Sequence, residues 1–401
     1  MARVERSDIP VRPEELDPAW LSVALRSSGW IDGGNVVAVE RQILGAGEGF
    51  LGVIARLALR FEGERSAPDS VIAKLPTFVQ ENRLMGELMG AYWREICFYR
   101  ELADQVPVRT PKLYYADLDP DPAREKQEQI VAQLDRLPLW FARSTMPLAR
   151  FIARRKAHRY VLLIEDFSAA RLGDQVGGGG IADCRRVLLA IAAVHAAFWQ
   201  SGRLEKLWWL ARQDANPRIR HGMYLQGRPA FERRYATRME ADPDLVRAIR
   251  WLDANGIALA RALHGDAPCT LLHCDLRLDN VFFEEGEGAD GVILCDWQLT
   301  GCGAAGYDVA YLVSGALDRD VTHEQELALL REYHDALCNG GVEEYPYNQL
   351  LRDYERGLLA VLQVISSTDN MDLGEDRGIT LMDLWLERTV GRIRNLSLDK
   401  L

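Results

Sequence analysis

Short apolar runs separated by turn signals dominate the first part of the chain. The runs at 36–44, 53–61 and 70–75 have strand length and are rich in β-branched residues. Consecutive runs of this kind predict a small antiparallel sheet built from hairpins. A wide apolar face over 82–105 predicts a helix, and Asp17-Pro18 is a typical start for a short helix near the N-terminus.

Two further strands are expected at 112–118 and 160–164, and the charged segment 120–158 between them is interpreted as an insertion. The four glycines at 177–180 predict a flexible loop, and the apolar stretch 183–199 predicts a helix.

The chain then reads as mainly helical, except for a compact patch at 271–296. The pattern therefore predicts an α+β protein with a sheet-rich part at 1–165, a helix-rich part at 166–401 and a hinge near 164–167.

Composition narrows the class of protein. The chain has 401 residues, of which 48% are hydrophobic and 27% charged, as in soluble globular proteins. Its formal net charge is −11, and a surplus of anions disfavours nucleic acid as a partner. The stretch 187–199 is too short to span a membrane, and the seven cysteines form no C-x-x-C pair. We therefore expect a cytoplasmic protein with no membrane partner, zinc site or disulfides.

The strongest chemical signal is H-x-D-x-x-x-x-N, formed by His273, Asp275 and Asn280 between two apolar runs. Asp296 follows a further apolar run at 292–295. Asp and Asn oxygens suit a hard cation such as Mg²⁺, and another carboxylate can accept a hydroxyl proton. A hairpin with a polar turn is the alternative. The full spacing, with Asp296 after a second strand, favours a functional site.

A glycine cluster at 45–52 includes Gly45, Gly47 and Gly49. Closely spaced glycines let the backbone approach a phosphate and offer it N–H groups. No helix is expected after the cluster, which excludes a dinucleotide fingerprint and a Walker loop. A glycine-rich hairpin turn is the commoner explanation of such a cluster by itself.

Lysine is rare here, with six residues against 42 arginines, so Lys74 within the apolar run 71–75 stands out. A buried Lys needs a carboxylate or another anion nearby. Glu95 is the candidate partner, with Glu87 and Glu101 as competitors on the same predicted helix. The alternative is an edge-strand lysine that faces solvent.

The segment 162–167 leaves the sheet-rich part, and its backbone could hydrogen-bond a flat heterocycle such as adenine. An ordinary strand end explains it equally well. His195 is expected to be a core histidine, and Asp308 to cap a helix or brace the Asp275 loop.

In this order, the motifs resemble small-molecule kinases of the protein-kinase-like fold, which include aminoglycoside phosphotransferases, choline kinases and ecdysteroid kinase-like enzymes. The resemblance runs from about 43 to 312. It implies a two-lobed fold with a small antiparallel-sheet N-lobe and a larger, mainly helical C-lobe. It also implies transfer of a phosphate from ATP, with GTP as an alternative, to a small-molecule hydroxyl in the presence of Mg²⁺.

The same resemblance implies a role for each candidate residue. Asp275 would be the catalytic carboxylate, and Asn280 and Asp296 would hold Mg²⁺. The residues that would contact the nucleotide are Gly45, Gly47 and Gly49 over the triphosphate, Lys74 paired with Glu95, Arg277 at the γ-phosphate, and Glu165 to Phe167 as the adenine hinge.

Two departures qualify the resemblance. Cys274 replaces a common glycine, and Asp296-Trp297-Gln298 lacks the glycine of D-F-G. The D-[FW]-Q pattern and the segment 194–199 favour the ecdysteroid kinase-like branch over the aminoglycoside branch.

Two other functions are weighed against a kinase. Cys274 motivates an inactive nucleotide-binding regulator, whereas a metal-dependent hydrolase using His273 would leave Lys74 without a role. The acceptor stays open among antibiotics, sterol-like alcohols, choline-like amines and sugars.

Overall fold

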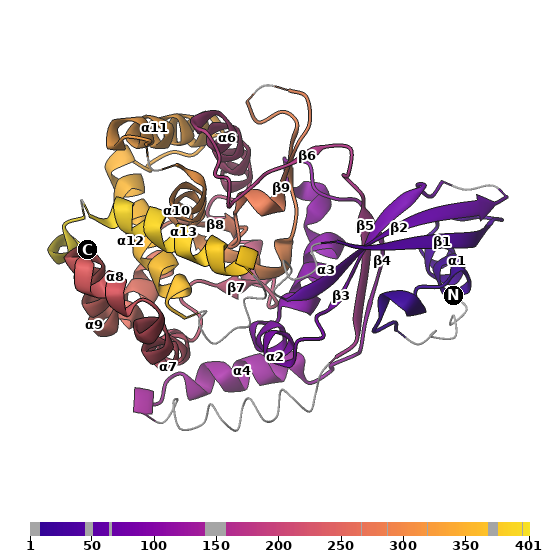
Figure 1. Cartoon of the computed structure of the whole chain (residues 1–401), viewed down its shortest axis with the longest axis horizontal. Coiled ribbons are helices and arrows are strands. Elements are labelled where there is room, and N and C mark those ends of the chain that lie inside the picture. Colours follow the sequence, from indigo (N-terminus) through magenta and orange to yellow (C-terminus); the bar gives the residue numbers. More distant parts are fainter. Residues whose placement is uncertain are drawn as a thin grey trace.

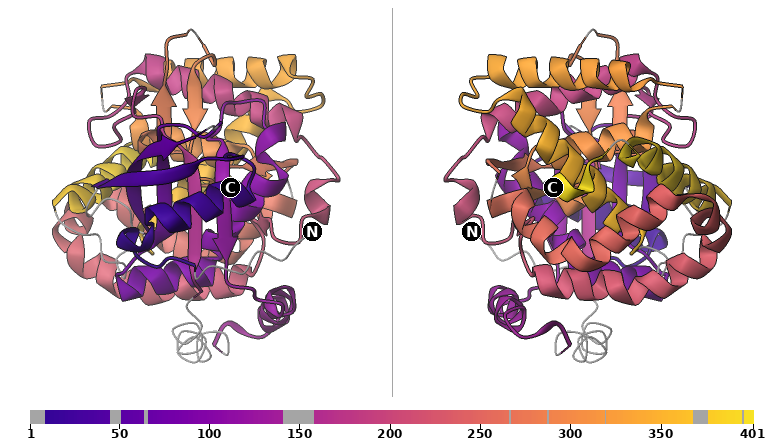
Figure 2. Two further views of the ribbon diagram at one scale, coloured as in Figure 1. Left: turned by 90° about the vertical axis from the view of Figure 1, so that its right-hand side faces the viewer. Right: turned by 90° about the vertical axis from the view of Figure 1, so that its left-hand side faces the viewer.

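The computed structural model describes residues 9–44, 51–63, 66–140, 158–265, 267–286, 288–318, 320–367, 376–394 and 396–401. A twisted sheet with its helices forms one lobe, and a larger group of helices forms the other (Figure 1). We call the elements up to β5 the N-lobe and those from β6 onward the C-lobe. Seen end-on, the N-lobe sheet lies in front of the helical lobe (Figure 2).

The N-lobe sheet is antiparallel and has the order β1-β2-β3-β5-β4. Its strands are β1 (Asn35–Leu44), β2 (Gly52–Glu62), β3 (Ser70–Pro76), β4 (Leu113–Leu118) and β5 (Tyr160–Glu165). The five predicted strand runs are therefore confirmed, with β5 inserted between β3 and β4.

Side-chain alternation gives this sheet two covered faces. Val71, Ala73 and Leu163 point to a core shared with α1 (Pro18–Ser27), which Asp17 caps by accepting the Trp20 N–H at 2.8 Å. Leu162 and Ile164 belong to the other core, with α3 (Ala91–Glu101) and the C-lobe. Lys74 alternates with Ala73 and therefore lies on this second face.

The single helix predicted over 82–105 is wrong in one respect. The segment forms α2 (Gln80–Met89), α3 and a short 3₁₀ turn, with a break at Gly90. Gly90 has a φ of 68°, the left-handed conformation that ends a helix. Within the expected insertion, the structure adds α4 (Arg124–Leu134), and residues 141–157 lie outside the described part.

The C-lobe is mainly helical, as predicted. Its helices are α6 (Ile181–Ala197), α7 (Pro217–Arg234), α8 (Ala236–Ala241), α9 (Pro243–Gly265), α10 (Gly306–Ala316), α11 (His323–Asn339), α12 (Tyr347–Ile365) and α13 (Asp376–Ile393). All eleven residues of α10 are buried, so this helix is the centre of the lobe.

Short strands next to the N-lobe complete the structure. One three-stranded sheet has the order β10-β9-β6 and the other β7-β11-β8. Their bounds are β6 (Arg171–Leu172), β7 (Ala211–Arg212), β8 (Cys269–Leu272), β9 (Val281–Phe283), β10 (Val292–Leu294) and β11 (Gly301–Ala304). The loops after β8 and β10 carry the polar motifs. The α+β, two-lobed organisation is thus confirmed, while the boundary at 165 and 166 stays a prediction.

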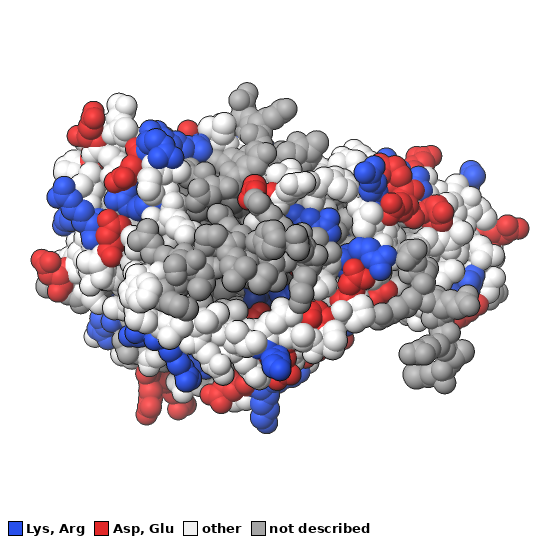
Figure 3. Space-filling view, turned by 90° about the horizontal axis from the view of Figure 1, so that it is seen from below, with Lys and Arg blue, Asp and Glu red and all other residues white. Residues whose placement is uncertain are grey.

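Two surface features bear on possible partners. Acidic and basic side chains are interspersed over the face in Figure 3 rather than gathered by sign. Among the described residues, no helix combines the length and the apolar character needed to cross a bilayer.

Candidate active site

His273 anchors the loop after β8 to its surroundings. Its Nε2–H donates to the Cys295 carbonyl at 2.8 Å, and its Nδ1 accepts the Asp275 N–H at 3.3 Å. The ring also packs against Trp297, with centroids 4.6 Å apart. Trp297 stacks on Phe98 of α3 at 4.3 Å and 7°. The histidine therefore ties this loop to the β10 loop, and through Trp297 to the N-lobe helix.

Asp275 is 7% exposed and holds hydrogen bonds on both carboxylate oxygens. Asn280 donates Nδ2–H to Oδ2 at 3.0 Å and to the Asp275 carbonyl at 2.9 Å. Tyr311 of α10 donates its hydroxyl to Oδ1 at 2.8 Å. Burial raises the pKa of Asp275, and the repulsion of Asp296 adds to the rise. The carboxylate is consequently held in place and is a stronger base than an exposed aspartate.

Lys74 joins the two lobes. Its Nζ lies 2.6 Å from Glu95 Oε1 on α3 and 2.7 Å from Asp296 Oδ1 after β10. Burial would lower the pKa of Lys74, but the attraction of Asp296 and Glu95 outweighs it and raises the pKa. Burial raises the pKa of Glu95, whereas Lys74 offsets burial at Asp296 and lowers the pKa of that carboxyl.

The structure chooses among the candidate partners of Lys74. Glu87 lies on α2 and accepts the His158 Nδ1–H at 3.0 Å. Glu101 accepts the Trp209 indole N–H at 3.0 Å. Glu95 remains, and its second oxygen accepts the Tyr160 hydroxyl at 2.8 Å.

Two loop residues adopt the left-handed conformation, Cys274 and Asp296, each with a φ of 64°. Asp308 on α10 holds the first loop by accepting the N–H groups of His273 and Cys274 at 2.6 and 2.9 Å. Asp308 therefore braces the loop, which is one of the two roles considered. Burial raises the pKa of the Cys274 thiol well above its usual value, so it stays protonated at neutral pH.

The oxygen set suits a hard divalent cation. Within the described chain, both hydrogen bonds of the Asn280 side chain use its amide nitrogen, which leaves Oδ1 for a metal. Among the described residues, Asp296 Oδ2 accepts a hydrogen bond from the Gln298 amide at 3.2 Å. The described residues contain no cluster of three or more His, Cys, Asp or Glu that could bind a metal. A Mg²⁺ ion here would need phosphate oxygens and water as further ligands, as is usual for Mg²⁺ sites in proteins that bind nucleotides.

Arg277 lies beside the Asp275 carboxylate. Its Nε is 3.7 Å from Asp275 Oδ1, and its Nη1 is 3.9 Å from Asp279 Oδ2. Burial disfavours its charge, but the attraction of Asp275 and Asp279 outweighs burial and raises its pKa. The guanidinium is therefore charged and adjacent to the oxygens that a transferred phosphate would approach.

The side chains of Glu165 and Phe167, in the predicted hinge, contact residues other than Lys74, Glu95 and Asp296. Glu165 pairs with Arg109 at 3.0 Å, and its N–H donates to the Lys112 carbonyl at 3.0 Å. Phe167 is buried. Its ring centroid lies 4.8 Å from Cζ of Arg109 and 5.8 Å from the ring centroid of Phe282. Any adenine contact here would rest on the remaining backbone groups. Gly45, Gly47 and Gly49 lie outside the described residues.

Sequence reasoning did not assign a site role to three residues that hydrogen-bond to Glu95, Asp275 and Asp296. These are Tyr160, Tyr311 and Gln298, respectively. Tyr160 opens a predicted strand, and Tyr311 follows Asp308 by three residues, which puts both on one face of a helix. The sequence positions of these two tyrosines could have marked them as candidates. The partners of their hydroxyl groups could not be predicted, because they depend on tertiary packing.

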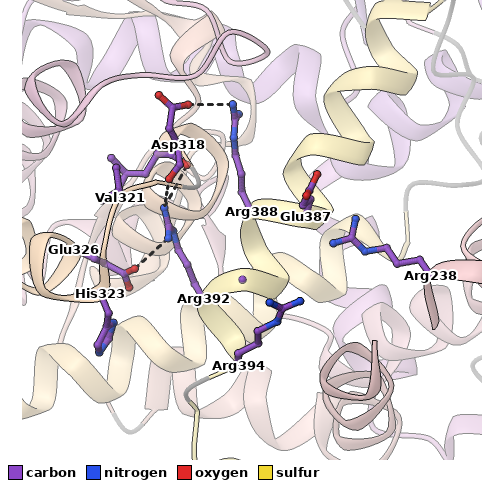
Figure 4. Close-up of a pocket in the computed structure, with 11 residues that line it drawn as sticks. Arg238, Asp318, Val321, His323, Glu326, Glu387, Arg388, Arg392 and Arg394 are labelled. Atoms are coloured by element: carbon purple, nitrogen blue, oxygen red, sulfur yellow. Dashed lines mark hydrogen bonds and ion pairs between the residues drawn. The ribbon is translucent and has the colours of Figure 1, made fainter. Parts of the chain in front are cut away.

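Two cavities lie elsewhere in the C-lobe. One, of about 300 Å³, is walled by α13, α8 and the segment after α10, and Arg238, Arg392 and Arg394 line it (Figure 4). The other, of about 740 Å³, lies between α13 and α7–α8. Neither is lined by a predicted site residue. In Figure 4, dashed lines join Arg392 to Glu326 and Arg388 to Asp318. Arg394 pairs with Asp242, so at least three of the four lining arginines are already paired.

A small antiparallel sheet, the Lys74–Glu95 ion pair on one of its faces and an H-x-D loop in a helical lobe are the features expected of the protein-kinase-like fold of small-molecule kinases. The model of the ecdysteroid kinase-like family matches residues 46–341, and the chain belongs to that family. This agrees with the branch that the D-[FW]-Q pattern favoured.

Solved structures with similar folds are distant in sequence. An amicoumacin kinase in complex with AMP-PNP, Ca²⁺ and Ami is 11% identical over 90% of this chain and 91% of that chain, with a TM-score of 0.49. A choline kinase from Cryptosporidium parvum Iowa II is 11% identical over 88% of each chain, with a TM-score of 0.46. A Plasmodium vivax ethanolamine kinase is 12% identical over 88% of this chain and 81% of that chain, with a TM-score of 0.45. Comparison with curated proteins gives no match.

Proposed function

We propose that this protein is an ATP- and Mg²⁺-dependent phosphotransferase that moves the γ-phosphate to a hydroxyl of a small molecule. One observation carries the proposal: Lys74 of the N-lobe lies within 2.7 Å of both Glu95 and Asp296. A buried lysine held by two carboxylates suits phosphoryl transfer, because Glu95 would keep the ammonium in position for the phosphates while Asp296 would hold the metal.

Asp275 is proposed to orient the acceptor hydroxyl and take its proton. The acceptor oxygen then bonds to the γ-phosphorus as the bond from phosphorus to the β–γ bridging oxygen breaks, leaving ADP. Burial raises the pKa of Asp275 and so makes it a better base. The chemistry that a bound Mg²⁺ supplies is neutralisation of phosphate charge, and Asn280 and Asp296 are the residues that would hold it.

The remaining roles concern the nucleotide. Lys74 would contact the α- and β-phosphates, with Glu95 keeping it in position at 2.6 Å. Arg277 would meet the γ-phosphate beside Asp275. Gly45, Gly47 and Gly49 would cover the triphosphate, and the backbone from Glu165 to Phe167 would hold the base. This assigns nucleotide binding mainly to 1–165 and acceptor binding to 166–401.

The test is ADP release by the purified protein with Mg-ATP and a panel of aminoglycosides, macrolides, sterols, amino alcohols and sugars. We expect at least one acceptor to raise ADP release above the rate with water, and Asp275→Asn to abolish the increase. The product is then identified by its added phosphate mass. Equal ADP release by the wild type and Asp275→Asn with every acceptor would refute the proposal.

The second candidate, an inactive nucleotide-binding regulator, is separated by the same experiment. The Cys274 conformation motivates it, because a side chain occupies a left-handed position in the catalytic loop. A regulator would be stabilised against heat by Mg-ATP but would release no ADP with any acceptor. An active kinase shows both effects.

A further inference from the structure

The carboxylate of Asp275 receives a hydrogen bond that the proposed roles do not use. Tyr311 donates its hydroxyl to Oδ1 at 2.8 Å, while Asn280 occupies Oδ2 at 3.0 Å. Both donors are buried, so water does not compete for these bonds. Each oxygen of the carboxylate is thus assigned to a different donor, one from the loop itself and one from α10.

The helix that carries Tyr311 is fixed to the same loop at a second point. Asp308, three residues earlier on α10, accepts the backbone N–H groups of His273 and Cys274. Residues three apart share one face of a helix. One face of α10 therefore holds both the backbone of the loop, through Asp308, and the side chain of Asp275, through Tyr311.

The tyrosine itself has little freedom to move. Its ring packs against Trp385 of α13, with centroids 4.8 Å apart, and against Tyr307 at 5.9 Å. Burial, and then the repulsion of Asp275, raise the pKa of Tyr311 well above its usual value. The hydroxyl therefore keeps its proton and remains a donor at neutral pH.

We propose that Tyr311 is a positioning residue for phosphoryl transfer, whose hydroxyl fixes the orientation of the Asp275 carboxylate toward the acceptor hydroxyl. The inference rests on the proposed kinase function. Among the described residues, the Tyr311 hydroxyl donates to Asp275 and not to Lys74 or Asp296, although the charge of Arg277, a proposed γ-phosphate contact, acts on it. Loss of this hydroxyl should consequently slow transfer without weakening nucleotide binding.

The test compares Tyr311→Phe with Tyr354→Phe. Tyr354 on α12 donates its hydroxyl to Glu326 at 2.8 Å, so it makes the same kind of buried bond to a carboxylate, on residues with no proposed catalytic role. ADP release is measured with Mg-ATP and the acceptor identified in the screen, or with water where hydrolysis is measurable. We expect Tyr311→Phe to lower kcat about tenfold, the size of effect expected for one hydrogen bond to a charged group.

The KM for ATP and the thermal shift caused by Mg-ATP should stay within about twofold of the wild type in both variants, and Tyr354→Phe should keep the wild-type kcat. A second variant, Trp385→Leu, keeps the hydroxyl but removes the ring that packs on Tyr311. It should lower kcat less than Tyr311→Phe does. It also gives a reading should Tyr311→Phe fold poorly.

The inference is overturned when Tyr311→Phe keeps the wild-type kcat, or when both tyrosine variants lose activity in proportion to their loss of stability. Failure of the kinase proposal looks different. In that case the wild type itself matches Asp275→Asn with every acceptor, and both proposals fall together.

Discussion

Cys274, in the loop after β8, has a φ of 64°, a backbone conformation that costs conformational free energy for a residue with a Cβ. A residue with a Cβ loses about 1 kcal/mol in the left-handed region, whereas glycine does not. We therefore predict that Cys274→Gly is more stable than Cys274→Ala by about 1 kcal/mol, the reverse of the usual order. Both variants lose the thiol, so their difference isolates the backbone effect. Urea denaturation measures it, and an alanine variant at least as stable as the glycine variant contradicts the strain argument.

Lys74 supports a stability prediction as well as a functional one. Lys74→Met leaves the buried Glu95 and the partly buried Asp296 without their common cation, so the free energy of unfolding should fall by about 3 kcal/mol. Adding Glu95→Gln should recover part of the loss, because one uncompensated charge disappears. Lys112→Met is the matched control, since Lys112 is exposed, and it should change the free energy by about 0.5 kcal/mol or less.

An equal loss in the two lysine variants, measured by urea denaturation, would show that the ion pairs do not stabilise the fold.

Lys74 also shows how much of the site can be predicted from the sequence. Strand alternation puts Lys74 on the face opposite Val71 and Ala73, and this follows from the sequence alone. Which glutamate it meets does not follow, because the break at Gly90 moves Glu87 onto a different helix from Glu95.

Among the elements, one titratable residue just before β5 contacts α2 and the turn before α4. His158 donates its Nδ1–H to Glu87 Oε2 at 3.0 Å, and its Nε2 lies 3.6 Å from Asp121. The hydrogen bond to Glu87 is the main cause that raises the pKa of His158 above its usual value of 6.5, and partial burial opposes it.

A raised pKa in the folded state means that protonation stabilises the fold. The contribution of His158 should be fully present below about pH 6.5 and should disappear as the pH rises through the higher folded value. The side chain is partly exposed, so we expect about 1 kcal/mol or less. The measurement is the difference in unfolding free energy between the wild type and His158→Gln from about pH 5.5 to about 9.

That difference should shrink toward high pH. A difference for His158→Gln that is constant with pH, or grows as the pH rises, contradicts the charge-assisted bond. His221 and His264 have lowered pKa values because of burial, so their contributions run the other way and cancel in the comparison.

At the scale of the whole molecule, the local pattern predicts the five N-lobe strands, a few helices and a mainly helical second half, but not the arrangement of these elements. Each of the five strand runs has strand length and is rich in β-branched or aromatic residues, so local sequence is enough to find them. The position of β5 between β3 and β4 depends on pairing across more than eighty residues, Val71 with Glu165 for example. Long-range pairing leaves no local trace, and neither does the convergence of Tyr311 on Asp275.

Binding of Mg-ATP at the proposed site beside Lys74 and Asp296 should stabilise the whole chain against unfolding. A ligand that binds only the folded state stabilises it by about 2.7 kcal/mol at a hundred times its Kd. We expect Mg-ATP to raise the Tm by several degrees, and ATP with EDTA to raise it less, because Asn280 and Asp296 would bind the nucleotide through the metal.

Asp296→Asn should lose the part of the shift that depends on Mg²⁺, because a neutral amide binds a hard cation more weakly than a carboxylate does. Asp290→Asn provides the matched control, since Asp290 is exposed in the turn between β9 and β10 and should keep the full shift. Equal shifts with Mg²⁺ and with EDTA in the wild type would remove the metal from the proposed site. A full Mg²⁺-dependent shift in Asp296→Asn would leave metal binding in place but assign it to other residues.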